Sequence, residues 1–325
     1  MANVLLSTKA VGSTVKLKVN GTAKEFIVVH QGKPSSLYDD SCNGTWLLMK
    51  DIYENRQWHN SNVNNLENST IHSYLNGTFL NLFESNIRDA IKQVKLPYRK
   101  NGGSGGSDQS GANGLLCKIF LLSGYEIGFT TSDNPYFPVD GAKLSYFEAG
   151  TGSSALNKRI AYLNGSAASW WLRSPYTGDT YNVWLVYSSG NYNGGGASGS
   201  VGIRPALILP STLLVSDDGT VSTNTPPTIT STSGASGVNL GSKTAAFSFK
   251  YTPNDADGDK LTVTEKLDGV VKKTRTNVTS GTQLTFECAS TAAEFQKILN
   301  GTHTITIEVS DGKASATFTA TFTKA

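Results

Sequence analysis

The feature that most limits the fold is a period-two alternation of polar and apolar residues near the end of the chain. Five segments carry it: 247–251 (FSFKY), 261–264 (LTVT), 283–286 (QLTF), 304–309 (TITIEV) and 317–323 (TFTATFT). Such alternation is typical of strands with one buried face, and turns separate the segments. It predicts an all-β immunoglobulin-like sandwich over residues 226–325, with one short helix at 292–299. The Cys-Trp-Cys pattern of antibody domains is absent from the sequence.

The preceding residues mix strand and helix signals. Alternation at 13–19, the Asn20-Gly21 turn and the apolar run at 25–30 predict a β-hairpin. Two helical stripes follow, capped by Ser69 and Ser85, and the second stops before Pro97. We therefore expect an α+β domain at residues 1–212. Residues 213–225 are expected to be an interdomain linker, because they end in the extended stretch TVSTNTPP that runs to Pro227.

The bulk properties exclude several classes of protein. A chain of 325 residues exceeds one compact core, which favours two domains. The net charge is only +3 and the basic residues are scattered, so nucleic acid is not an expected partner. We find no signal peptide, lipidation motif or membrane-spanning run, and expect synthesis in the cytoplasm without membrane insertion. Cys42, Cys117 and Cys288 lie far apart and are expected to be buried thiols.

Residues 176–200 (YTGDTYNVWLVYSSGNYNGGGASGS) have an unusual composition. Seventeen of the 25 are Tyr, Ser, Gly or Asn, and Asp179 is the only charged residue. Antibody paratopes share this composition because Tyr offers a large, rigid contact area while Ser, Gly and Asn adapt their hydrogen bonds. An ordinary Gly/Ser-rich loop is the simpler alternative, but a spacer has no use for four tyrosines and a tryptophan. The segment therefore predicts a ligand-binding surface.

Two blocks frame this segment: 170–175 (WWLRSP) and 202–207 (GIRPAL). The pair resembles the frame around the variable region of proteins diversified by diversity-generating retroelements, and of a widespread domain of gut bacteria and their phages. Blocks at 46–50, 96–99 and 119–124 are also similar, so the likeness spans roughly residues 10–210. The resemblance implies a C-type-lectin-like fold, related to formylglycine-generating enzymes, for residues 1–212.

In that family, mutation of adenines in Asn codons reaches Asn, Ser, Tyr, Gly, Asp, Thr and Ala, and never Lys, Glu, Gln or Met. The composition of 176–200 fits this rule, and Trp184 is the exception. The resemblance implies that the variable residues contact ligand. By match to the frame, the candidates are Tyr176, Thr177, Asp179, Tyr181, Asn182, Leu185, Tyr187, Ser189, Asn191, Tyr192, Asn193, Ala197 and Ser198.

Among these candidates, Tyr187, Asn191 and Asn193 are favoured, because they flank the turn at Ser189-Gly190. Alternation would direct the neighbouring side chains of Val183 and Val186 inward.

The family resemblance implies receptor binding by a phage tail or virion protein that sets host tropism. The expected partners are a host-cell surface protein or glycan and other virion proteins. A homo-oligomer is a further possible assembly. The alternative is a cell-associated bacterial protein for adhesion or ligand sensing. A formylglycine-generating-like enzyme is disfavoured, since no cysteine pair follows Cys117 in the first domain and the histidines are dispersed. We predict no catalytic residue and no cofactor.

Four residues of the framing blocks invite functional interpretations. Trp170 and Trp171 could stack on a sugar, but at least one is expected in the core. Arg173 and Arg204 sit in apolar segments, where a guanidinium bonded to carbonyls and a carboxylate is the commoner arrangement.

The acidic turn at Asp255, Asp257 and Asp259 could suit calcium. However, Lys260 and Lys266 stand where an EF-hand loop needs Gly and Glu. An Asx-type turn is the favoured interpretation, and no metal ligand is predicted.

Overall fold

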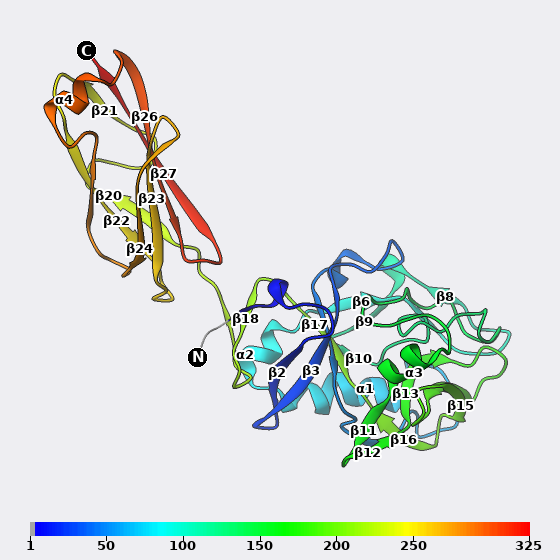
Figure 1. The fold of residues 1–325 in the computed structure, drawn as a ribbon. Helices are drawn as coiled ribbons and strands as arrows, with labels where there is room; N and C mark the ends of the chain where they lie inside the picture. Colours follow the sequence, from blue (N-terminus) through cyan, green and yellow to red (C-terminus); the bar gives the residue numbers. More distant parts are fainter. Residues whose placement is uncertain (1–3) are drawn as a thin grey trace. The chain divides into compact units, whose positions relative to one another are not determined.

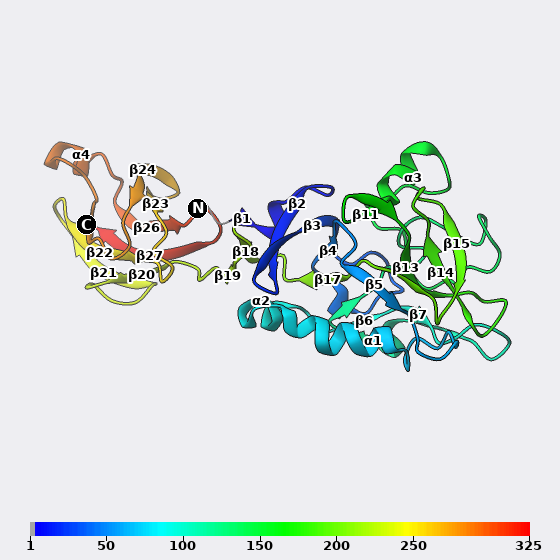
Figure 2. The ribbon, with the colours of Figure 1, turned by 90° about the horizontal axis from the view of Figure 1, so that it is seen from below.

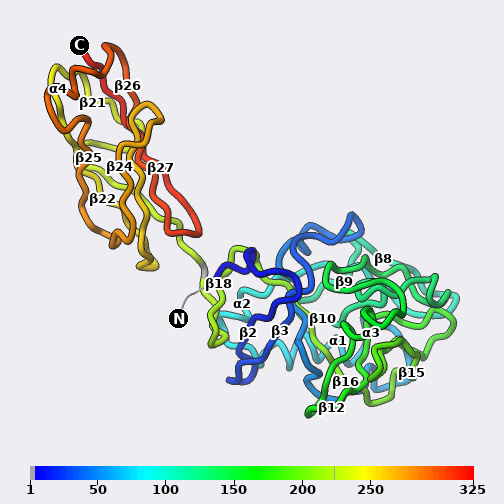
Figure 3. Tube along the Cα trace, viewed as in Figure 1, coloured from blue at the N-terminus to red at the C-terminus, as the bar shows by residue number. Residues whose placement is uncertain are grey.

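The computed structural model describes residues 4–325, and the chain divides into two compact units, Met1–Thr223 and Asn224–Ala325 (Figures 1 and 3). We call them unit 1 and unit 2. Strands make up 41% of the chain and helices 12%. The expectation of an α+β, C-type-lectin-like first domain is therefore wrong, because the structure is mostly β.

The reason lies in the two helical stripes. The first forms α1 (Thr70–Tyr74), which continues irregularly as η3 (Leu75–Phe79) and η4 (Leu80–Leu82). The second gives only α2 (Ser85–Ala90), because Ile91 is extended and the chain then enters strand β6 (Val94–Leu96). Apart from these runs, unit 1 has one further α-helix among its described residues, α3 (Ser153–Arg159).

Unit 1 is built around two five-stranded sheets, and Figure 2 shows strands of both. The first has the order β10 (Ile119–Phe120), β17 (Ala206–Leu209), β4 (Thr45–Met49), β3 (Thr22–Gln31) and β2 (Thr14–Val19). The second has the order β15 (Tyr192–Gly196), β14 (Asn182–Val186), β13 (Trp170–Pro175), β16 (Ser200–Ile203) and β5 (Glu54–Gln57). The Asn20-Gly21 hairpin between β2 and β3 is confirmed, with positive φ at both residues.

Short strand pairs complete unit 1. They are β6 with β9 (Leu115–Cys117), β7 (Tyr98–Arg99) with β8 (Asp108–Gln109), and β11 (Ala161–Leu163) with β12 (Ser166–Ala168). Short 3-10 turns occur at η1 (Leu6–Thr8), η2 (Asp40–Cys42) and η5 (Gly111–Asn113).

Most of the segment 213–225, which was expected to be a linker, is instead part of unit 1. Residues 213–223 supply β18 (Leu213–Val215) and β19 (Val221–Thr223), which form a three-stranded sheet with β1 (Val4–Leu5). Leu213, Leu214 and Val215 are all buried. Their apolar side chains explain the difference, since a solvated linker would leave them exposed. The boundary between the units falls after Thr223.

Alternate residues of the central strands enter two different hydrophobic clusters of unit 1. Leu47 of β4 belongs to one cluster and Leu48 to the other. Trp171 and Trp170 of β13 divide in the same way. Because successive side chains point to opposite faces of a strand, these strands are buried on both faces.

Unit 2 is an immunoglobulin-like sandwich. One sheet has the order β20 (Thr228–Ser231), β22 (Ser248–Asn254) and β25 (Leu284–Glu287). The other has the order β21 (Val238–Lys243), β27 (Ser315–Lys324), β26 (Gly301–Ser310), β23 (Leu261–Leu267) and β24 (Val270–Val278). This is the A-B-E and A′-G-F-C-C′ strand order of immunoglobulin-like domains, and α4 (Ala292–Gln296) provides the expected short helix. A single hydrophobic cluster of unit 2 is formed by residues of both sheets.

Candidate functional site

The candidate segment 176–200 forms the hairpin β14–β15 and its flanks. Strand β14 pairs with β13 on one side and β15 on the other, while β15 is the edge strand of the sheet (Figure 2). Residues 183–186 are all buried, with exposed fractions of 0–5%. Val183 and Val186 are buried as expected, but Trp184 and Leu185 between them are buried too. Strand β14 is therefore an interior support and offers no outward face.

The support is fixed by indole N–H groups that donate to backbone carbonyls. Trp171 Nε1 donates to Arg56 O at 2.9 Å, and Trp170 Nε1 donates to Arg159 O at 2.9 Å. Trp184 Nε1 bonds Tyr136 O at 3.1 Å. Trp170 and Trp171 are both fully buried, so both belong to the core and neither is free to stack on a sugar.

Asn64 holds the chain at 176–182 from beneath. Its side chain is fully buried, and Nδ2 lies 3.3, 3.0 and 2.8 Å from the carbonyl oxygens of Tyr176, Asp179 and Asn182. Its Oδ1 accepts from the N–H of Gly102 at 2.9 Å. Two amide hydrogens are thus shared among three carbonyls, and the amide oxygen accepts one N–H, which fixes the path of this loop.

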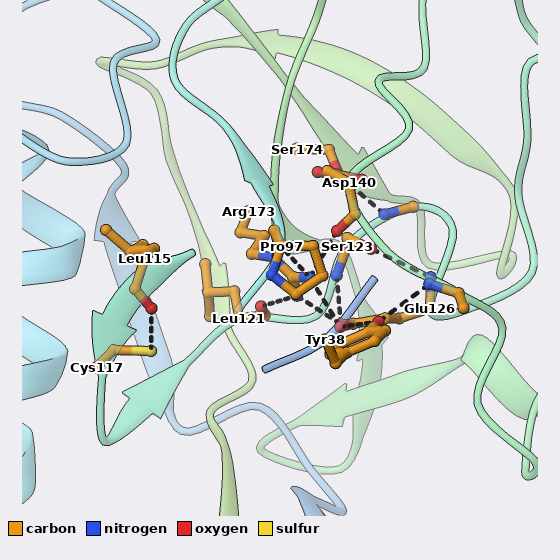
Figure 4. A network of polar contacts seen from close by, with 12 residues as sticks. Tyr38, Pro97, Leu115, Cys117, Leu121, Ser123, Glu126, Asp140, Arg173 and Ser174 are labelled. Atoms are coloured by element: carbon orange, nitrogen blue, oxygen red, sulfur yellow. Dashed lines mark hydrogen bonds and ion pairs between the residues drawn. The ribbon is translucent and has the colours of Figure 1, made fainter. Parts of the chain in front are cut away.

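A buried ion pair joins Arg173 of β13 to Glu126 (Figure 4). Arg173 Nη1 and Nη2 bond the two Glu126 carboxylate oxygens at 2.5 and 2.7 Å, and Arg173 also donates to the carbonyl oxygens of Pro97, Leu121 and Asp140. Tyr38 donates to the same glutamate at 2.8 Å. Burial disfavours the charged guanidinium, yet the attraction of Glu126 raises the pKa of Arg173. The structural interpretation of Arg173 is confirmed, because all these partners are protein groups.

Asp140 borders this network. It is fully buried, its Oδ2 accepts from Ser174 Oγ at 2.7 Å, and its Oδ1 has no hydrogen-bond partner. Burial raises the pKa of this carboxyl to about 7, although Arg173 and Ser174 oppose the shift. Arg204 is also buried and donates to the carbonyls of Met49 and Lys50, but it has no carboxylate partner and its Nη1 has no hydrogen-bond partner, so the expected arrangement is present only in part.

The exposed part of the segment carries two large tyrosines. Tyr181 is 47% exposed and Tyr187 is 46% exposed, and Ser189 is exposed at the hairpin tip. Tyr187 Oη accepts from Asn193 Nδ2 at 2.6 Å, which orients the ring. Asn191, Asn193 and Ser198 are half-buried, so their side chains are still accessible in part. The three favoured residues, Tyr187, Asn191 and Asn193, thus lie together at the turn end of the hairpin, whereas Tyr181 precedes β14 at its other end.

Other candidates are accessible but already bonded within the protein. The Tyr176 ring stacks on Tyr136 with centroids 4.7 Å apart, and Thr177 Oγ1 donates to Tyr136 O. The Asp179 carboxylate accepts from the N–H groups of Tyr181 and Asn182 and from Asn182 Nδ2. Asp179 and Asn182 therefore close a turn.

Tyr192 is half-buried. Its hydroxyl donates to Asp133 O at 2.8 Å, and its ring packs edge-on against Phe129, Phe137 and Trp184. This tyrosine contributes more to packing than to the surface.

Two candidates are wrong. Leu185 is only 5% exposed and Ala197 is fully buried, and both pack in the cluster that contains Trp171. Leu185 is buried because β14 is covered on both faces, so alternation does not bring it outward. Ala197 follows β15 and its N–H donates to Tyr181 O, which turns its methyl group into the core.

Sequence reasoning missed Tyr136, Asn62 and Asn64. Tyr136 is 44% exposed beside Tyr176, and Asn62 Oδ1 lies 3.3 Å from both N and Oγ of Ser198. All three lie in irregular loops that are far in sequence from residues 176–200. These loops have no periodic pattern of polar and apolar residues that would predict their position. The only available signal was the aromatic-rich composition of residues 134–152.

A polar hollow of about 390 Å³ lies beside the end of the segment. Its lining residues are Asn55, Arg56, Gln57, Asn60, Thr70 and Ser200. The Arg56 guanidinium stands 3.5 Å from the centre of the Tyr74 ring and is paired with Glu54, so it is held in place. Room for polar ligand groups therefore exists beside Ser200, the last residue of the segment.

The cysteines are poor nucleophiles. All three are buried and unpaired, as expected for buried thiols. Burial raises the pKa of Cys42 to about 12 and also raises the pKa of Cys117 and of Cys288. Their thiols thus stay protonated at neutral pH. No helix among residues 4–325 is long and apolar enough to span a bilayer.

Comparison with known protein families assigns a family to residues 43–211, which lie in unit 1. Residues 43–211 match the family model described as Domain of unknown function (DUF6273), which is more than half of the chain. The chain belongs to the DUF6273 family. The DUF6273 match includes all of β5, β13, β14, β15 and β16, and so contains the whole candidate segment. No curated protein matches the chain.

Among solved structures, the similar ones are β-domains of low identity. The PKD domain of an M14-like peptidase from a Thermoplasmatales archaeon is 18% identical and covers 31% of this chain and 97% of its own, with a TM-score of 0.23. The fibronectin(III)-like modules of Clostridium thermocellum CbhA are 18% identical and cover 30% and 99%, with a TM-score of 0.22. The CARDB domain of the Pyrococcus furiosus PF1109 protein, solved with di-metal ions, is 20% identical and covers 30% and 96%, with a TM-score of 0.20. The strand order of unit 2, and not these scores, identifies its sandwich fold.

Proposed function

We propose that this DUF6273 protein is a ligand-binding protein whose contact surface is the exposed part of hairpin β14–β15. The observation that carries the proposal is the division within residues 181–193. Tyr181, Tyr187 and Ser189 are exposed, while residues 183–186 are buried on both faces of the sheet. Exposed tyrosines on a rigid support give a large contact area at low entropic cost.

We further propose that the ligand is a cell-surface protein or glycan and that a virion carries the protein. The surface is nearly uncharged, since Asp179 is the only charged residue of the segment and its carboxylate is occupied by the turn. Recognition would then rest on aromatic stacking and hydrogen bonds. The polar hollow lined by Ser200 supplies additional donors and acceptors at the end of the segment.

We also propose that a retroelement diversifies this surface. The support for this idea is that mutated Asn codons reach the residue types found at the exposed candidates Tyr181, Tyr187 and Ser189 and at the half-buried candidates Asn182, Asn191, Asn193 and Ser198. Closely related copies of the gene should then differ at these positions and agree at residues 183–186. Differences spread evenly along the chain would contradict diversification.

Binding is tested by capture of the labelled full chain on a panel of intact bacterial cells and on a printed glycan array. The triple variant Tyr181→Ala, Tyr187→Ala, Asn193→Ala should lose capture. The matched control is Tyr162→Ala, because Tyr162 is 48% exposed but lies on β11, outside the segment. Undiminished capture by the triple variant would refute the assigned surface, whereas loss in the control variant would show a non-specific effect.

A further inference from the structure

The acidic turn of unit 2 brings three carboxylates closer together than the turn itself requires. Asp255, Asp257 and Asp259 lie between β22 and β23, and one carboxylate oxygen from each lies within 4.8 Å of the others. One cation faces them, Lys313, whose Nζ is 2.7 Å from Asp259 Oδ2. Three carboxylates and one ammonium leave two negative charges without a partner.

Asp255 provides an independent observation. It is 7% exposed, and its Oδ1 accepts from the N–H groups of Asp257 and Asp259, each at 3.0 Å. Those two bonds complete the Asx-type turn expected from the sequence. Its Oδ2, however, is buried and has no hydrogen-bond partner. An unpartnered carboxylate oxygen is costly to bury, so the turn alone does not account for this side chain.

The start of unit 2 brings a neutral oxygen to the same end of the sandwich. Thr225 donates its N–H to Asp257 Oδ2 at 2.6 Å, and Asn224 Nδ2 donates to Asp311 Oδ2 at 2.9 Å. Asn224 Oδ1 is buried and has no partner. Asp311 in turn accepts from the N–H of Lys313, the residue that pairs with Asp259. Residues 224–225, 255–259 and 311–313 therefore form one connected group.

We propose that Asp255, Asp257 and Asp259 bind one calcium ion, with Asn224 supplying an amide oxygen. A hard divalent cation prefers carboxylate and amide oxygens, and its two positive charges match the two negative charges that Lys313 leaves uncompensated on Asp255, Asp257 and Asp259. Calcium is favoured over magnesium because it accepts an irregular, partly hydrated oxygen shell. The ion would join the first residues of unit 2 to the turn between β22 and β23. This site is separate from the proposed binding surface and revises the sequence-based expectation of no metal ligand.

The test uses the full chain freed of metal by a chelator and titrated calorimetrically with CaCl2 or MgCl2. We expect one calcium ion to bind per chain, more tightly than magnesium. Calcium should also raise the thermal unfolding midpoint of unit 2, by about 5 °C or more at saturation. Absence of binding heat at about 5 mM calcium, which would saturate even weak extracellular-type sites, together with an unchanged midpoint, would overturn the proposal.

Single Asp→Asn variants test which carboxylates bind the ion. Asp255→Asn keeps an acceptor for the turn, and Asp257 is exposed, so Asp257→Asn spares the fold. Each should weaken calcium binding by about tenfold or more, because ligand charge sets affinity. Asp268→Asn is the matched control, since it removes one carboxylate that bonds His303 at another turn of unit 2. Equal calcium affinity in wild type, Asp255→Asn and Asp257→Asn would overturn the proposal.

The variant Lys313→Gln distinguishes a cation-binding site from a turn that has only a structural role. Removing the ammonium that competes for Asp259 should tighten calcium binding by several-fold while lowering stability in the absence of calcium. A turn that needs no ion would lose stability without gaining affinity, and that result would count against the site.

Discussion

Asn64 is the single residue on which the shape of the candidate surface most depends. Its amide hydrogens face three carbonyls of the 176–182 loop, and none of these contacts involves a side chain of the segment. The loop can therefore change its side chains while keeping its path. The sequence does not reveal this role, because Asn64 stands in an Asn-rich loop without any periodic pattern.

Substitution of Asn64 tests this role. Asn64→Ala should cost about 1–3 kcal/mol in free energy of unfolding, since the carbonyls of Tyr176 and Asp179 lose their donor. Asn64→Asp should cost more at pH 7, because a carboxylate would face three carbonyl oxygens and repel them. Urea unfolding at pH 7 measures both. Wild-type stability of Asn64→Ala would show that the carbonyls have other donors, and equal stability of the two variants would show that the added carboxylate is not repelled.

Asp140 gives a pH-dependent prediction. Its pKa in the folded protein is about 7, above the ordinary value of 3.8. The folded protein therefore keeps a proton that the unfolded chain loses between pH 4 and 7, so this group's contribution to stability is full below pH 4 and is lost as the pH rises to 7. The slope is at most about 1.4 kcal/mol per pH unit. Asp140→Asn should remove this component, and identical pH profiles of unfolding for wild type and variant would contradict the prediction.

Among the elements, strand β14 separates the fixed part of the segment from its accessible part. Val183 and Val186 are buried as expected, but alternation alone cannot explain this, because Val183 shares its face with Leu185 and Val186 shares the other face with Trp184. A period-two pattern assumes one solvated face, whereas β14 lies between β13 and β15 with both faces covered. A run of four apolar residues, 183–186, was the available sign of a strand buried on both faces.

The two kinds of position should respond differently to truncation. Trp184→Ala should cost about 3–5 kcal/mol in free energy of unfolding, because the indole is buried against Phe137 and Tyr192. Tyr187→Ala should change it by no more than about 0.5 kcal/mol, because the ring is exposed. Chemical denaturation of both variants checks the contrast, and a large loss in Tyr187→Ala would mean that the ring packs on the protein.

Of the two helices predicted from local sequence patterns, the first is present and the second is shorter than predicted. The Ser69 cap is present, since its Oγ accepts from the N–H of His72. The stripe after Ser85 does not persist, because Val94 pairs with Cys117 in a strand that brings residues from beyond the 101–114 loop. A non-local pairing of this kind overrides helical spacing and leaves no trace in the local pattern.

For the whole molecule, each unit has its own hydrophobic core. Alternation in unit 2 located five of its eight strands, β22, β23, β25, β26 and β27, and missed β20, β21 and β24. Strand β24 was missed because its residues are mostly exposed, so polar and apolar residues do not alternate along it. The class of unit 1 was predicted wrongly, because its strands are short and their order depends on pairings such as β13 with β16 that join distant segments.

The core of unit 2 predicts that residues 224–325 fold alone. Its cluster includes Phe249, Phe286, Val309 and Phe322, all within this range. The isolated fragment should give a β-type circular dichroism spectrum and one cooperative thermal transition. A fragment that stays unfolded would show that its core is insufficient.

The central claim is that exposed side chains of hairpin β14–β15 can vary while the strand beneath them cannot. Its most direct test is a library displayed on cells and sorted for protease resistance, with Tyr181, Tyr187, Ser189, Asn191 and Asn193 randomised in one half and residues 183–186 in the other. We predict that most members of the first half stay folded and that few of the second do. Equal survival of the two halves, or better survival of the second, would contradict the account.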